Sequence, residues 1–162
     1  MANETSLNFL QSNSAVLLIN ILPNVAFHTS EFQIPGLSLN PAEQQTPFGP
    51  HGVAGDTVEF ETLNISFNVN EDMSNWLEAF YWIMALGAPE GYEQYDDKDR
   101  YSDAEIILYS SKNNPIGKIK FIDCIPVSLG AIDFTEEDSE TVYKKCNFEL
   151  KYTFYQFSRE QS

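Results

Sequence analysis

The side chains that most often carry chemistry in enzymes are scarce in this chain. Its 162 residues include two histidines, His28 and His51, and two cysteines, Cys124 and Cys146. A histidine base needs a nucleophile beside it, and neither histidine lies in a recognisable nucleophile motif. The cysteines have neither the CxxC pattern nor the spacing of a zinc site. We therefore predict no catalytic residue, no metal site and no cofactor, and we interpret the cysteines as buried thiols.

Three evenly spaced glycines form the next candidate site, in the stretch TPFGPHGVAGDTVEF at residues 46–60. Gly49, Gly52 and Gly55 match neither a dinucleotide fingerprint nor a Walker loop, because no Lys-Ser/Thr pair follows them. They also precede a predicted strand, whereas a phosphate-binding loop leads into the N-terminus of a helix. With phosphate binding set aside, the stretch is interpreted as a plain turn or as an arm that reaches a neighbouring molecule.

Acidic residues dominate the charge of the chain. It has 24 Asp and Glu residues against 9 Lys and Arg residues, a formal net charge of −15. A protein that grips duplex DNA by its phosphates needs clustered cations, so this balance argues against that class. It fits simple solubility or a surface past which DNA slides. The acidic runs at 96–99 and 136–140 lack EF-hand spacing, so solvated loops are favoured over calcium sites.

The hydrophobic pattern predicts a mainly β protein with one helix. Hydrophobic residues make up 43% of the chain, and the 12 Phe and 8 Tyr favour sheets over disorder. The helix is expected at about residues 72–86, where apolar residues recur every three or four positions: Met73, Trp76, Leu77, Phe80, Ile83 and Met84. Asp72 or Ser74 can cap its start, and its aromatic stripe is expected to face the core. Strands are expected at 14–22, 31–37, 57–69, 104–110, 118–124, 125–134 and 142–157.

The apolar pattern within two of these segments supports more specific predictions. In 57–69 the alternation of apolar residues slips, which predicts a bulge near Glu61 and Thr62. The run at 14–22 is apolar nearly throughout and is expected to be a buried strand. No linker divides the chain, so we predict a single domain over 1–162 whose residues 1–13 form a flexible N-terminus. The sequence shows neither a membrane span nor an export signal.

The order of these motifs resembles the tail-tube superfamily of contractile-tailed bacteriophages. The most specific pieces are PFGP at 47–50, FNVNEDMSNWLEAFYW at 67–82, and IDFTEEDS with FELKYTFYQF, which ends at 157. The likeness covers roughly Ala15 to Phe157, and within the superfamily it is strongest to the tail completion, or tube terminator, proteins of myoviruses. The resemblance implies an α+β, mainly β fold: an antiparallel β-sandwich or barrel with one packed α-helix.

The resemblance also implies a structural role in the virion, with no enzymatic activity. Family members assemble as six-fold rings around the DNA channel, so a homohexamer is expected. Such a ring would cap the head-proximal end of the tail tube, end its growth and help to join tail to head, after assembly in the host cytoplasm. The expected partners are other copies of the chain, the tail tube protein, and a sheath terminator or head-tail connector protein. DNA would pass only as cargo, and no membrane is involved.

Two sets of residues follow from the resemblance. Residues 40–57 occupy the place of a loop that family members project toward neighbouring subunits or rings, and we expect it to become ordered on contact. The candidate arm residues are Pro47, Phe48, Gly49, Pro50, His51, Gly52 and Gly55. Carboxylates that line the channel would let DNA pass without sticking. The candidate lumen acids are Glu136, Glu137, Asp138, Glu140 and Glu149.

Other functions stay open at this point. A major tail tube protein, a baseplate tube initiator and the tube protein of a bacterial secretion system would share the fold. From a different class, a small β-rich binding module predicts a well-formed apolar pocket in a stable monomer.

Overall fold

The computed structural model describes residues 10, 11, 13–88, 100–135 and 143–159. Antiparallel strands make up most of it, with two helices, so the predicted α+β, mainly β fold is confirmed. In chain order the elements are β1 (Ala15–Ile19), α1 (Pro23–Phe27), β2 (Thr29–Phe32), β3 (Leu37–Leu39), β4 (Ala42–Thr46), β5 (Gly49–Val53), β6 (Val58–Phe60), β7 (Leu63–Asn68), α2 (Ser74–Gly87), β8 (Ser102–Tyr109), β9 (Pro115–Leu129), β10 (Lys145–Lys151) and β11 (Phe154–Arg159).

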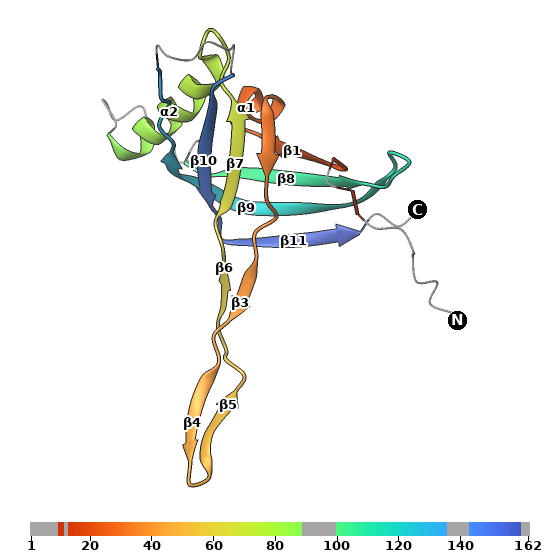
Figure 1. Ribbon diagram of the computed structural model, residues 1–162, viewed down its shortest axis with the longest axis vertical. Helices are drawn as coiled ribbons and strands as arrows, with labels where there is room; N and C mark the ends of the chain where they lie inside the picture. The colour runs from red at the N-terminus through yellow and green to blue at the C-terminus, as the bar shows by residue number, and fades with distance from the viewer. Residues whose placement is uncertain (1–9, 12, 89–99, 136–142, 160–162) are drawn as a thin grey trace.

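Two antiparallel sheets share the long strand β9. Its first half lies between β8 and β11 in a sheet of order β1-β8-β9-β11, and its second half continues a sheet of order β9-β10-β7-β2. In Figure 1 the first sheet runs across the view and the second runs along the long axis, so their strands cross. A strand that bends from one sheet into the other makes such a corner. The two strands expected at 118–124 and 125–134 are therefore one continuous strand that ends at Leu129.

The bend in β9 is fixed at Asp123. This residue has a positive φ of 56°, and β9 carries one extra residue here opposite β8. Asp103 on β8 holds the bend, because its carboxylate accepts the N–H of Asp123 at 3.3 Å and pairs with the Lys120 ammonium at 3.1 Å. The hydrogen bond to Asp103 raises the pKa of Lys120.

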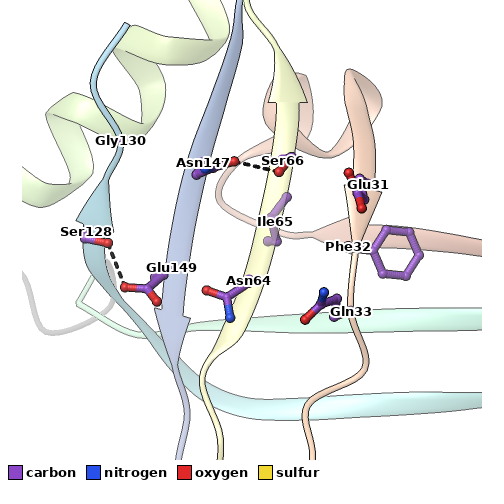
Figure 2. Close-up of a pocket in the computed structure, with 10 residues that line it drawn as sticks. All are labelled: Glu31, Phe32, Gln33, Asn64, Ile65, Ser66, Ser128, Gly130, Asn147 and Glu149. Atoms are coloured by element: carbon purple, nitrogen blue, oxygen red, sulfur yellow. Dashed lines mark hydrogen bonds between the residues drawn. The ribbon is translucent and has the colours of Figure 1, made fainter.

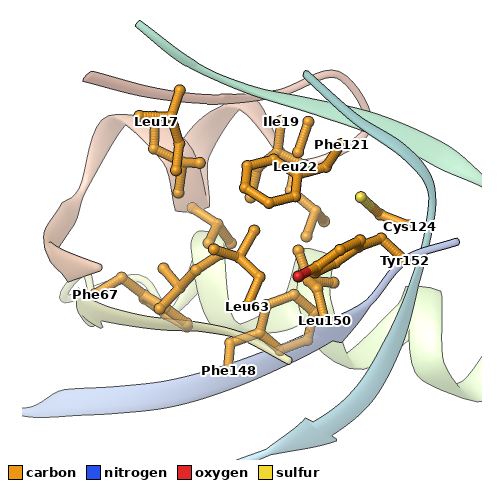
Figure 3. Close-up of a cluster of buried hydrophobic side chains, with 14 of the residues drawn as sticks. Leu17, Ile19, Leu22, Leu63, Phe67, Phe121, Cys124, Phe148, Leu150 and Tyr152 are labelled. Atoms are coloured by element: carbon orange, nitrogen blue, oxygen red, sulfur yellow. The ribbon is translucent and has the colours of Figure 1, made fainter. Parts of the chain in front are cut away.

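The core fills the space between the two crossing sheets (Figure 3). The strands of the two sheets contribute alternate residues, as the pattern of β10 predicted for Cys146, Phe148 and Leu150. Both cysteines are buried free thiols, which confirms their interpretation, and burial raises the pKa of Cys124 to about 12. The fully buried side chains of largest volume are Phe67, Phe121, Phe148, Leu22, Leu63, Ile65, Ile106 and Leu150.

The first apolar run differs from its prediction. Leu17 and Ile19 face the core, but Val16 and Leu18 are exposed, because β1 is an edge strand whose outer face has no covering layer among the described residues. The end of the run also turns into the short helix α1, which no sequence pattern indicated. Pro23 starts this helix at a position where a missing N–H costs nothing.

Three other predicted strands are interrupted. The strand expected at 31–37 breaks between Phe32, where β2 ends, and Leu37, where β3 begins. The expected bulge at Glu61 and Thr62 is a complete break, where the chain passes from β6 to β7. The segment expected as one strand at 142–157 breaks at Tyr152 and Thr153, after which β11 crosses to the first half of β9. The Tyr152 hydroxyl donates to the Glu61 carbonyl at 2.6 Å and ties the latter two breaks together.

Helix α2 lies where it was predicted, but it buries a different face. The N-cap residue is Met73, with a φ of 56°, and no side chain caps the helix, so the predicted cap by Asp72 or Ser74 is wrong. The Asp72 carboxylate, one residue before the N-cap, accepts the N–H of Ser74 at 3.1 Å, which lowers the pKa of Asp72. The fully buried residues are Asn75, Ala79 and Trp82. Of the predicted core stripe, Trp76 and Ile83 pack partly on the core. The remainder of the stripe is wrong as a core prediction, because Met73, Leu77, Phe80 and Met84 are half-buried or exposed.

We predict that Phe148→Ala lowers the free energy of unfolding by about 3–5 kcal/mol, because it leaves a cavity between the two sheets. Urea unfolding followed by circular dichroism measures this. Phe157→Ala is the matched control: Phe157 on β11 is largely exposed, so its removal is expected to cost only about 0.5 kcal/mol. Equal losses in the two variants would contradict the placement of the core.

Candidate functional site

The glycine-rich stretch forms the outer half of a long hairpin. β3 pairs with β6 at its base, and β4 pairs with β5 at its end. Figure 1 shows this hairpin, residues 37–60, pointing away from both sheets along the long axis of the molecule. We call it the arm. Of the interpretations of the sequence, the geometry matches a projecting arm that ends in a tight turn.

The turn at the tip is built by three local features. Register pairs Thr46 with Gly49, so Pro47 and Phe48 form the loop. The Thr46 hydroxyl donates to the Gly49 carbonyl at 2.6 Å. Gly49 has a φ of +126°, which residues with a side chain rarely adopt. The Phe48 side chain is consequently fully exposed at the tip.

The seven predicted arm residues all lie in this hairpin. Pro47 and Phe48 form the turn, Gly49 to Gly52 form most of β5, and Gly55 lies in the connection to β6. A Cβ at Gly55 would lie 1.5 Å from the Asn40 carbonyl oxygen, so only glycine fits there. Their contact with other subunits stays a prediction.

The arm carries apolar side chains that the rest of the described chain does not cover. Leu37, Leu39, Val53 and Val58 are all exposed, as is Phe48 at the tip. An isolated two-stranded hairpin is marginally stable in water, so such an arm gains stability from a partner surface.

A polar surface covers the outer face of the second sheet, on strands β9, β10, β7 and β2 (Figure 2). The Ser66 hydroxyl donates to the Asn147 side-chain oxygen at 2.7 Å, and the Ser128 hydroxyl donates to the Glu149 carboxylate at 2.8 Å. These residues border a shallow groove of about 420 Å³. Its polar lining residues are Glu31, Gln33, Asn64, Ser66, Ser128, Asn147 and Glu149.

The groove in this polar sheet face is lined by acids without cations, whereas Lys145 and Lys151 lie on the same outer side of β10, at its two ends. The charged residues that line the groove are the acids Glu31 and Glu149, with amides and hydroxyls between them. Hydroxyls and amides hydrogen-bond water, and the carboxylates repel phosphate, so the groove can border a path for a polyanion without binding it. Of the predicted lumen acids, Glu149 lies on this face. Glu136, Glu137, Asp138 and Glu140 lie outside the described residues.

Sequence reasoning missed a second hollow, at the end of the second sheet far from the arm. This cleft of about 710 Å³ is open to solvent. Its signal in the sequence was weak, since its exposed aromatics Phe134 and Tyr143 stand singly beside an acidic run. Its lining is His28, Asn68, Val69, Asn70, Glu71, Met73, Ile132, Phe134, Tyr143 and Lys144.

The residues considered for catalysis do not come together. His28 borders the cleft and contacts Phe27 edge to face at 4.9 Å, whereas His51 lies on β5 of the arm. Within the described ranges, no group of three or more His, Cys, Asp and Glu side chains is placed to hold a metal ion. Neither described helix has the length and apolar character to cross a membrane.

One curated relative matches the sequence. The chain is 23% identical over 135 residues to the tail tube terminator protein of Enterobacteria phage T4, covering 78% of this chain and 74% of that protein. No protein-family model matches the chain. The resemblance to tail-tube proteins, seen in the motifs, is thus also found by comparison of whole sequences.

Solved structures of contractile injection systems share the fold. A chain in the structure of the anti-feeding prophage tube-terminating cap has a TM-score of 0.66 at 12% identity, covering 94% of this chain and 93% of that one. A chain in the structure of the PVC sheath/tube terminator has a TM-score of 0.69 at 10% identity, covering 93% and 97%. A chain in the PVC sheath-tube complex gives 0.66 at 11% identity, covering 96% and 95%. The tail-tube type of the fold is therefore confirmed.

We predict that Gly55→Ala disorders the arm without unfolding the body, because the new Cβ would collide with the Asn40 carbonyl. Hydrogen exchange at residues 42–53, measured in the assembled protein where the arm is expected to be ordered, is expected to become faster, while exchange in β8 and β10 stays unchanged. Gly52→Ala is the matched control, since nothing lies within 4 Å of its added Cβ. An arm that exchanges alike in both variants would contradict this packing.

Proposed function

We propose that this protein is a tail-tube terminator, a structural protein that forms a ring at the head-proximal end of the tube of a contractile tail and ends tube growth. The observation that carries the proposal is the match over most of the chain to a protein named as a tail tube terminator. The fold supports it but does not separate the terminator from a tube protein, since terminator and sheath-tube structures match about equally well.

The open edges of the second sheet support a ring. Among the described strands, β2 pairs only with β7, and residues 125–129 of β9 pair only with β10. Because the sheet has four alternating strands, β2 and β9 run in opposite directions. A copy added by rotation can therefore place its β2 antiparallel against the open edge of β9. Repetition closes a continuous barrel that leaves no edge unpaired, and the resemblance gives six copies.

In this ring the polar sheet face lines the channel. Glu31 and Glu149 then point at passing DNA, and the acids 136–140 are proposed to add to the same negative surface. DNA is cargo that the wall repels, and the protein has no enzymatic activity.

The arm is proposed to contact the tail tube protein. It projects from one end of the subunit and presents exposed Phe48 at its tip. A ring of six arms on one side gives one adhesive face, as a terminator requires. The opposite face is then left for a sheath terminator or a head-tail connector protein, within a particle assembled in the host cytoplasm.

The alternatives have less support. A tube protein or a baseplate tube initiator fits the fold, but the curated relative favours the terminator. A binding module predicts a well-formed apolar pocket, whereas the groove on the polar sheet face is lined mainly by polar residues and the cleft at the end of the second sheet is open to solvent.

The first test is the solution mass of the protein by light scattering over a concentration series, with negative-stain images of the same samples. We expect discrete rings with about six times the mass of one chain that do not stack, because both sheet edges are paired in the ring and only one face carries arms. Long tubes would instead assign the chain to the major tube protein, and a strict monomer would contradict the self-assembled ring.

The second test concerns the channel. We expect that rings of the wild type do not bind short duplex DNA, and that Glu31→Lys combined with Glu149→Lys gives binding that weakens steeply with added salt. Fluorescence anisotropy of labelled DNA measures this. The control carries the same charge change on exposed acids away from the polar sheet face, Glu43→Lys with Glu71→Lys. Equal DNA binding by the two variants would contradict the channel assignment.

A further inference from the structure

Helix α2 is apolar on both of its sides. Asn75, Ala79 and Trp82 face the core. Leu77, Phe80, Tyr81 and Met84 follow the i, i+3, i+4, i+7 spacing of a second stripe on the opposite side. Tyr81 is 63% exposed and Met84 is 41% exposed. We call this second stripe the outer α2 face.

The outer α2 face has the composition of a contact surface. Glu78 is the one charged residue of the helix, and its side chain accepts a hydrogen bond from the Asn24 amide on α1 rather than facing outward. Helices that are hydrophobic all round are normally buried on all sides. An apolar patch of this kind on a folded protein marks an interaction site.

The position of α2 identifies which partner would cover this face. The helix packs against β9, the strand with the open edge, and near Glu78 it also contacts α1 of its own copy. At the other open edge, β2 follows directly after α1, whose last residue, Phe27, is 84% exposed. Figure 1 shows both helices at the same end of the second sheet, the end away from the arm. Pairing of β2 with the β9 edge of another copy therefore carries its α1 toward α2 of that copy.

We infer that Phe27 of one copy packs on the outer α2 face of the next copy, as the apolar part of the subunit contact around the ring. This inference rests on the proposed ring. The occupant is a second copy of this chain. Phe27 lies beside the β2 edge and the outer α2 face lies beside the β9 edge, and these are the two edges that pair between copies in the proposed ring. The outer α2 face presents the thioether of Met84 and the aromatic rings of Phe80 and Tyr81, and both kinds of group pack well against a phenyl ring.

Cross-linking tests the contact directly. Phe27→Cys and Met84→Cys are made in separate chains, mixed, and treated with a short bismaleimide. A cross-linked dimer is expected in the mixture and not with either variant alone, since the contact joins Phe27 of one chain to Met84 of another. The wild type is the reagent control, because Cys124 and Cys146 are buried.

Disruption tests whether the contact matters for assembly. Phe27→Ser and Met84→Lys are each expected to raise the concentration needed for ring formation at least about tenfold, the effect of losing roughly 1.4 kcal/mol per contact. Phe157→Ser is the control, since it removes a largely exposed ring from β11, which lies outside both open edges of the second sheet. Unchanged thermal unfolding of the monomer checks that the variants fold.

The outcomes separate this inference from the ring itself. Rings that form normally in Phe27→Ser and Met84→Lys, with no cross-link in the mixture, would overturn the contact and leave the ring standing. A wild type that stays monomeric at every concentration would overturn the ring and the contact together.

Discussion

The bend in β9 is the constraint on which the rest of the structure depends. One strand serves two sheets, and the Asp103 carboxylate fixes the place where it changes from one to the other. Because the sheets cross there, their inner faces enclose a single core although neither sheet is large. The same bend turns β9 away from β8, so β9 no longer pairs with β8 beyond Cys124. The geometry that encloses the core therefore leaves the edge of β9 at residues 125–129 open.

The open edges and the apolar surfaces follow from one cause. A chain of this size could cover its strand edges with its own segments, yet β2 and residues 125–129 of β9 have no second strand partner among the described residues. Exposed edges of this kind invite pairing with another chain. The exposed side chains of the arm, α1 and α2 lie outside the core for the same reason: in the proposed assembly their partners are other molecules.

The sequence predicted the parts of this design that local pattern encodes. Alternation in β10 located its inward residues, and the three-to-four spacing located α2. Local pattern could not identify the buried face of α2, because a helix with one charged residue has no polar side to mark the solvent. It also missed α1, since five residues are too few to show a period. The exposed side of β1 depends on its place at a sheet edge, which is a tertiary property.

For the candidate site as well, the sequence predicted the part that local pattern encodes and missed the part that depends on the tertiary structure. Glycine spacing pointed to the arm because Gly49 and Gly55 meet local steric demands that only glycine satisfies. The polar sheet face gave no such signal, since its serines and amides become a surface only when β2, β7, β10 and β9 lie side by side. Growth by head-to-tail stacking continues wherever both ends are complementary. In the proposed ring the end opposite the arms is the one that receives no further tube ring, and the cleft beside Phe134 and Tyr143 opens at that end.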